Sequence, residues 1–295
     1  MSSLPTPAPG IPQTASRQRD VLWIAAVALV YFVAAATSGH FEFDDRIAVI
    51  SAAAGVFLPA LLLTRRDLRV ALTLVLLATH AASELVTGES LPTALGFAFA
   101  MAAHAALSVW LLRAFRADPF DVVRLRHLVT WVVASVLGAN VVTSLIAAGV
   151  VTFLARDVPL GIGWMRWALS QGVANVLLTP FVLAWAARLE RGWPSPRRLI
   201  EPALLMTGVA LIAFIPFQRF ETSPWIPFLA PYAGVPFLLW AALRFEQRGV
   251  TTAMLAFGGV AVVCTTAGHA VAGASVLTLG ERVLFIQLIL AMVAI

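Results

Sequence analysis

The sequence contains no lysine, because all twenty of its basic residues are arginine. A lysine amine forms the Schiff base that holds retinal or pyridoxal, and the phosphate-binding loop of P-loop nucleotidases also carries a lysine. Retinal-based light-driven pumping and P-loop ATP hydrolysis are therefore excluded. Cysteine is almost as scarce: Cys264 is the only one, so the chain cannot form an intrachain disulfide.

Charged residues are also few. They make up 12% of the 295 residues, whereas about 25% is typical of a soluble domain. Hydrophobic residues make up 60%, and the mean hydropathy is +0.90. The arginines stand in short loops between apolar stretches, and no basic run is long enough to suggest a nucleic-acid-binding surface. The composition predicts an all-α integral membrane protein with the lipid bilayer as its main partner.

Apolar stretches fill the chain after a Pro-, Ser- and Thr-rich segment at 1–20, which we expect to be a disordered cytoplasmic tail. Most stretches have the roughly 20 residues that a helix needs to cross a bilayer. A tenth stretch follows Arg282 and has 13 residues, too few for a complete span. We therefore expect a ten-span transmembrane bundle over 21–295 that is the front part of a longer polypeptide. The nine longer stretches are 21–38, 47–64, 70–87, 91–112, 128–154, 162–187, 199–217, 225–243 and 250–272.

The distribution of arginine predicts the topology. If the spans alternate from a cytoplasmic start, fifteen of the twenty arginines fall on the inside. This positive-inside bias predicts that both the N-terminus and the C-terminus are cytoplasmic. The least certain span is 225–243, whose three prolines are compatible with a re-entrant segment. The sequence Asp118-Pro119, with Asp121 close behind, predicts an N-cap at the start of the fifth helix.

Polar side chains inside the spans are the candidate functional groups, because such groups are expensive in lipid. His80 and Glu84 are four residues apart and therefore share a helix face near the outer end of the third span. Other polar groups fall at mid-membrane depth, and together they suggest a polar pocket open to the outside. The alternative is that they form interhelical hydrogen bonds that fix packing and bind nothing. The candidates are His80, Glu84, His104, Asn140, Gln171 and Asn175.

The sequence does not predict a metal site, a cofactor or a catalytic centre. One histidine and one glutamate are too few metal ligands, and an HExxH pair is absent. Glu42, Asp44 and Asp45 in the first outer loop could bind a cation, although such a run is more often a solvated loop. No serine or cysteine stands in a recognisable nucleophile motif.

Three stretches, in this order along the chain, resemble the membrane-associated sensor domain of the first type. They are WALSQGVANVLLTP at 167–180, LWAALRFEQRG at 239–249 and ERVLFIQ at 281–287. The region 68–115 is also similar. The sequence departs from the family pattern at Gln171, where an aspartate is usual, and at Met101 and His104, where asparagine and glutamate are frequent.

The resemblance implies a sensory input module in the cytoplasmic (inner) membrane of a bacterium. Such a module detects an outside or intramembrane signal, here a small molecule or a membrane protein. It passes the signal through its last helix, which contains Arg282 and Gln287, to a histidine kinase or a cyclic-di-GMP turnover enzyme. The resemblance also implies a homodimer through the output domain and this helix. The main alternative is a small secondary transporter with a midplane polar site, followed by an intramembrane enzyme.

Overall fold

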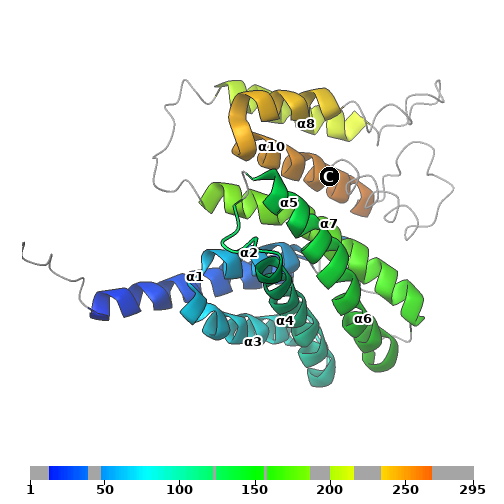
Figure 1. Ribbon diagram of the computed structural model, residues 1–295. Helices are drawn as coiled ribbons and strands as arrows, with labels where there is room; N and C mark the ends of the chain where they lie inside the picture. Colours follow the sequence, from blue (N-terminus) through cyan, green and yellow to red (C-terminus); the bar gives the residue numbers. More distant parts are fainter. Residues whose placement is uncertain are drawn as a thin grey trace, which may run out of the picture.

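The computed structural model describes residues 13–38, 48–121, 124–155, 158–186, 200–215 and 234–267, and their regular elements are helices (Figure 1). This confirms the predicted all-α fold. The long and medium helices are α1 (Gln13–Ser38), α2 (Ala52–Leu63), α3 (Arg69–Val86), α4 (Leu91–Ala114), α7 (Leu160–Ala186), α8 (Ile200–Phe214) and α10 (Val235–Thr266). A continuous helical segment between α4 and α7 consists of α5 (Leu125–Trp131), η3 (Val132–Ala139), α6 (Asn140–Val150) and η4 (Val151–Ala155), and a short η2 (Arg66–Leu68) precedes α3.

Among the described residues, six helical segments are long and apolar enough to cross a membrane. They are α1, α3, α4, the segment from α5 to η4, α7 and α10, while α2 and α8 are apolar but shorter. Each of the first nine predicted spans overlaps a described helix, and the tenth lies outside the described residues. The last part of the tail predicted at 1–20 is helical, because α1 begins at Gln13 and so includes residues 13–20. These mostly polar residues add about two turns to the helix before the apolar stretch.

Helix α10 consists of two stretches joined by a sharp bend (Figure 1). Glu246, at φ 55° and ψ −152°, lies outside the helical region. A Cβ atom added to Gly234 would lie 2.8 Å from Cε2 of Phe257, so the beginning of α10 packs beside its second stretch. The chain therefore folds back on itself near Glu246. This reversal falls between the two predicted spans at 225–243 and 250–272, as the arginines there indicated.

The predicted N-cap at Asp118 is wrong. The fifth helix begins at Leu125, and Asp118, Pro119 and Asp121 precede it in non-helical backbone. The carboxylate of Asp118 is instead bound by arginines of neighbouring helices, with Arg113 Nε at 3.0 Å. The tertiary structure thus places the Asp118 side chain in an ion pair, whereas the local sequence pattern predicted that it would cap a helix.

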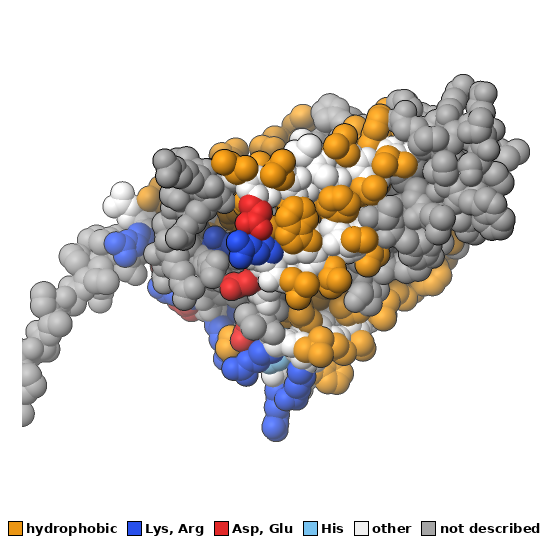
Figure 2. Space-filling model, turned by 90° about the horizontal axis from the view of Figure 1, so that it is seen from above, with side chains coloured by type: hydrophobic (Ala, Val, Ile, Leu, Met, Phe, Trp, Pro, Cys, Tyr) orange, Lys and Arg blue, Asp and Glu red, His pale blue; other side chains and the backbone are white. Residues whose placement is uncertain are grey.

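Arginines from several connections gather on one face of the bundle, which we call the arginine-rich face. Arg65, between α2 and α3, lies 3.6 Å from Asp20 at the start of α1. Arg66 of η2 lies 3.4 Å from Asp118 in the α4–α5 connection. Seen from above, charged side chains gather toward one side of the described surface and hydrophobic ones cover much of the rest (Figure 2). Because successive helices alternate in direction, these connections lie at the same end of the bundle.

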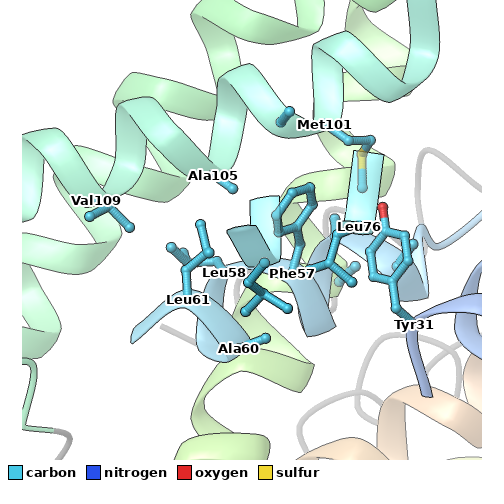
Figure 3. Packing of buried hydrophobic residues seen from close by; sticks show 14 of the residues in the cluster. Tyr31, Phe57, Leu58, Ala60, Leu61, Leu76, Met101, Ala105 and Val109 are labelled. Atoms are coloured by element: carbon cyan, nitrogen blue, oxygen red, sulfur yellow. The ribbon is translucent and has the colours of Figure 1, made fainter. Parts of the chain in front are cut away.

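The core between α1, α2, α3 and α4 is built from closely packed apolar residues (Figure 3). Phe57 and Leu58 of α2 belong to the same cluster as Leu76 of α3 and Met101 of α4. All four side chains are almost fully buried. Helices also approach one another at glycines. A Cβ atom on Gly55 would collide with Leu178 and lie 2.8 Å from the carbonyl oxygen of Ala174. Because lipid is as apolar as leucine, such close contacts contribute much of the association of membrane helices.

Candidate functional site

His80 and Glu84 lie together on α3, as their spacing predicted. His80 Nε2 is 3.5 Å from Glu84 Oε1. The His80 side chain is 6% exposed and that of Glu84 is 24% exposed, because Glu84 lies only two residues from the end of α3 at Val86. The pair therefore extends from the buried interior of the bundle toward the end of the helix.

Tyr31 of α1 completes this group, and the sequence analysis did not find it. Its hydroxyl oxygen lies 3.1 Å from His80 Nδ1. The edge of the Tyr31 ring meets Phe57 of α2, with ring centroids 5.5 Å apart and planes at 77°, and Figure 3 shows the tyrosine beside Phe57 and Leu76. The sequence does contain an indication of its role, because a tyrosine within an apolar span needs a hydrogen-bond partner for its hydroxyl. Tyr31 is one of only two tyrosines in the chain.

His104 of α4 is buried against the fifth helical segment. Its Nε2 atom is 3.4 Å from the hydroxyl of Ser108, one turn further along α4, and the ring also hydrogen-bonds the backbone of Ser135. Ser135 belongs to η3, a stretch of π-helix, and its carbonyl accepts the backbone N–H of Asn140. Such π-helical stretches frequently occur at functional sites. Within the described part of the chain, Ser135 Oγ and Trp131 Nε1 are buried without a hydrogen-bond partner.

Asn140 joins α6 to α7. Its Nδ2 atom donates to the carbonyl oxygen of Ala168 at 2.7 Å, and its Oδ1 atom accepts from the hydroxyl of Ser144 at 3.3 Å. A Cβ atom on Gly172 would lie 3.1 Å from Asn140 Nδ2, so a small residue on α7 lets the amide approach. This hydrogen bond joins two helices. It corresponds to a packing role for Asn140, which was the alternative to a place in a binding pocket.

Gln171 and Asn175 belong to a row of hydrogen bonds along α7. Trp167 Nε1 donates to Gln171 Oε1 at 3.0 Å, and Asn175 Nδ2 donates to the backbone oxygen of Gln171 at 2.9 Å. The Trp167 ring stacks on Phe97 of α4 with centroids 4.9 Å apart. Gln171 Nε2 is buried and has no partner among the described residues. An unsatisfied buried amide is costly, which makes Gln171 a candidate for binding a hydrogen-bond acceptor.

The structure thus brings the predicted residues into separate groups. His80 and Glu84 meet Tyr31, Asn140 meets α7, and the hydrogen bonds of His104 go to Ser108 and Ser135. A single pocket shared by His80, Glu84, His104, Gln171 and Asn175 stays a prediction. Arg282 and Gln287 lie outside the described residues, as do Glu42, Asp44 and Asp45.

The described residues also include possible metal ligands and the cysteine. In the part of the chain that the structure describes, no group of three or more His, Cys, Asp and Glu side chains could hold a metal ion. Cys264 is buried in a cluster with Phe257, Ala261 and Val262. It packs within the core.

The apolar helices and the polar side chains buried between them define a multi-pass helical membrane protein. Comparison with family models assigns it further: the chain belongs to the family MASE1, membrane-associated sensor domain 1, whose model matches residues 23–295. Members of this family are sensory, non-catalytic input domains of signalling proteins. No curated protein and no solved structure matches the chain.

Proposed function

We propose that this chain is the input module of a signalling protein in the inner membrane of a bacterium, and that it controls a cytoplasmic histidine kinase or cyclic-di-GMP turnover enzyme. The observation that carries the proposal is the family match, which extends over 23–295 and thus over nearly the whole bundle. In this proposal the arginine-rich face is cytoplasmic, in agreement with the positive-inside rule.

The buried polar contacts between helices supply a route for sensing. A ligand shifts an equilibrium between two helix arrangements only if it binds one arrangement more tightly than the other. The Tyr31–His80 contact joins α1 to α3, and the Asn140–Ala168 contact joins α6 to α7. A small molecule or a membrane protein that hydrogen-bonds to such a side chain in place of its present partner would favour one helix arrangement over the other.

The signal would leave the bundle through the last helix, which contains Arg282 and Gln287. Outputs of the proposed kind generally work as dimers, so the last helices of two protomers would lie near each other. Single cysteines placed along 283–295 of the full-length protein, with Cys264 replaced by serine, would then crosslink with helical periodicity. A pattern that changes with signalling state supports transmission through this helix, and an absence of crosslinks at every position contradicts it.

The experiment that tests the input function compares two forms of the full-length protein in membrane vesicles. One is the natural chain, and the other carries an unrelated single membrane span in place of residues 21–295. If the bundle is an input module, the output activity of the natural form responds to growth conditions or added signals and that of the replacement does not. Equal activity of both forms under all conditions, or a gene that encodes no output domain after Ile295, would overturn the proposal.

A further inference from the structure

Three titratable side chains form a row that joins α1 to α3. Tyr31 Oη lies 3.1 Å from His80 Nδ1, and His80 Nε2 lies 3.5 Å from Glu84 Oε1. The Tyr31 and His80 rings are 5.9 Å apart between centroids. Tyr31 and His80 are buried, whereas Glu84 retains contact with the surroundings at the end of α3. The row therefore has one accessible end and one buried end.

The contacts favour one arrangement of protons. The Tyr31 hydroxyl donates to Nδ1 of a neutral His80, whose own proton is then on Nε2. This proton is directed toward the Glu84 carboxylate at 3.5 Å, but among the described residues Nε2 makes no hydrogen bond. Adding a proton to His80 changes both contacts. Nδ1 becomes a donor, so Tyr31 must accept and turn its hydroxyl hydrogen elsewhere, while the cationic ring gains an ion pair with Glu84. A single proton thus reverses the hydrogen bond between α1 and α3.

We propose that the Tyr31–His80–Glu84 row is a proton-binding site, and that the bundle responds to acidification by repositioning α1 against α3. The proposal rests on the sensory function proposed above and names the signal that this group detects. Protons enter at Glu84, and His80 holds the bound proton. Tyr31, packed edge-on against Phe57 of α2, transmits the change to α1.

The neighbouring helices contribute little competing charge to this row. Asp20 of α1 and Arg69 of α3 are each eleven residues from Tyr31 and His80 respectively, about 16 Å along the helix axes. Helix α2, Ala52–Leu63, carries no titratable side chain. Between Leu91 and Leu112 of α4 the one titratable residue is His104, which binds Ser108 and the backbone of Ser135. Glu89 lies in the turn after α3, where its backbone N–H donates to the carbonyl oxygen of Glu84 at 3.0 Å. Among the described residues, Glu84 contacts the His80 ring directly and Glu89 is the next carboxylate along the chain. The other charged groups on α1 and α4 are Arg17, Arg19 and Arg113, toward the arginine-rich face.

Nitrogen-15 NMR of the full-length protein, labelled at its five histidines and reconstituted in lipid nanodiscs, tests the site directly. The probe is the proton itself, in a titration from pH 8 to pH 3. His80→Gln identifies the His80 signals by their loss. We expect these signals to change from the neutral to the cationic pattern within this range. Glu84→Gln should lower the midpoint by about one pH unit, because it removes the opposite charge, and His127→Gln should leave it unchanged.

The second measurement follows the helices. Spin labels at exposed Leu29 of α1 and Leu74 of α3, in a chain with Cys264→Ser, should report a change in distance over the same pH range. Tyr31→Phe should abolish this change while His80 still titrates. The proposal is overturned if His80 remains neutral at pH 3, if Glu84→Gln leaves the midpoint of its titration unchanged, or if the distance between the spin labels does not respond. These readouts need no output activity, so they fail independently of the input function itself.

Discussion

Arg69 and Asp118 connect three parts of the arginine-rich face. Arg69 Nη1 lies 3.3 Å from Asp118 Oδ2, which joins the start of α3 to the α4–α5 connection. The same guanidinium donates to the carbonyl oxygens of Thr64 at 3.0 Å and Leu62 at 3.4 Å, so it also satisfies backbone groups at the end of α2. The side chain of Asp118 is only 2% exposed and that of Arg69 is 11% exposed. This is a largely desolvated ion pair with a structural role.

We expect Asp118→Asn to lower the free energy of unfolding by about 2 kcal/mol, because it removes charged hydrogen bonds and leaves Arg69 buried without its anion. Thermal unfolding of the protein in detergent micelles measures the effect. Asp67→Asn is the matched control, since Asp67 and its partner Arg65 are 62% and 58% exposed and such pairs contribute little. Equal effects of the two substitutions would contradict a special role for Asp118.

The stability of this face should also depend on pH. Burial raises the pKa of Asp118, but hydrogen bonds from Arg69 and Arg113 and the charges of Arg69 and Arg66 outweigh it, so the pKa is lowered from its ordinary value. A carboxylate with a lowered pKa in the folded state stabilises the fold above its unfolded pKa of about 3.9. This contribution is lost as the pH falls from about 4 through the folded pKa. Unfolding midpoints measured between pH 6 and pH 2 should show this loss in the natural chain and a smaller one in Asp118→Asn.

Gly55 should not tolerate a methyl group. Gly55→Ala would force α2 and α7 apart at Leu178 and Ala174, and we expect a loss of about 2 kcal/mol from overpacking. Gly149→Ala is the control, because nothing lies within 4 Å of the added atom and alanine is the better helix former by about 1 kcal/mol. The two variants should therefore change the thermal midpoint in opposite directions. A gain of stability in both would mean that helix propensity, and not packing, governs these positions.

Two helix ends with the same hydrogen bonds use different residues. After α3, Gly88 has φ 92° and Glu89 N donates to Glu84 O at 3.0 Å. After α4, Arg116 has φ 57° and Ala117 N donates to Leu112 O at 2.7 Å. Glycine adopts positive φ without steric cost, whereas other residues do not. Arg116→Gly should raise the free energy of unfolding by about 1 kcal/mol, and Gly88→Ala should lower it by a similar amount. Stability changes of the same sign would refute this explanation.

The orientation of the bundle can be tested by labelling. In a chain with Cys264→Ser, single cysteines at Arg66, Arg116 and Arg248 should react with a membrane-impermeant maleimide only after the cells are opened. A cysteine at Glu89, at the opposite ends of α3 and α4, should react in intact cells. The expectation follows from the excess of arginine on one side. Labelling of Arg66 and Glu89 from the same side would contradict the alternating topology.

Much of the fold follows from the sequence alone. Long apolar stretches must form helices in lipid, because every backbone polar group needs an internal partner there. The positions of α3, α4 and α7 therefore agree with the predicted spans to within a few residues. The spacing of His80 and Glu84 also fixed their contact, since residues four apart on a helix are neighbours whatever the rest of the chain does.

Contacts between distant segments were decided by the tertiary structure. Nothing in the local pattern pairs Tyr31 with His80, 49 residues away, or directs Asp118 to Arg69 and not to a helix end. The partners of Asn140 and His104 likewise depend on which helices pack together and how each is rotated. Hydrophobicity determines that a stretch enters the membrane. The fit of side chains such as Leu178 against Gly55 determines the helix neighbours, and only those neighbours determine where a buried polar group finds its hydrogen bond.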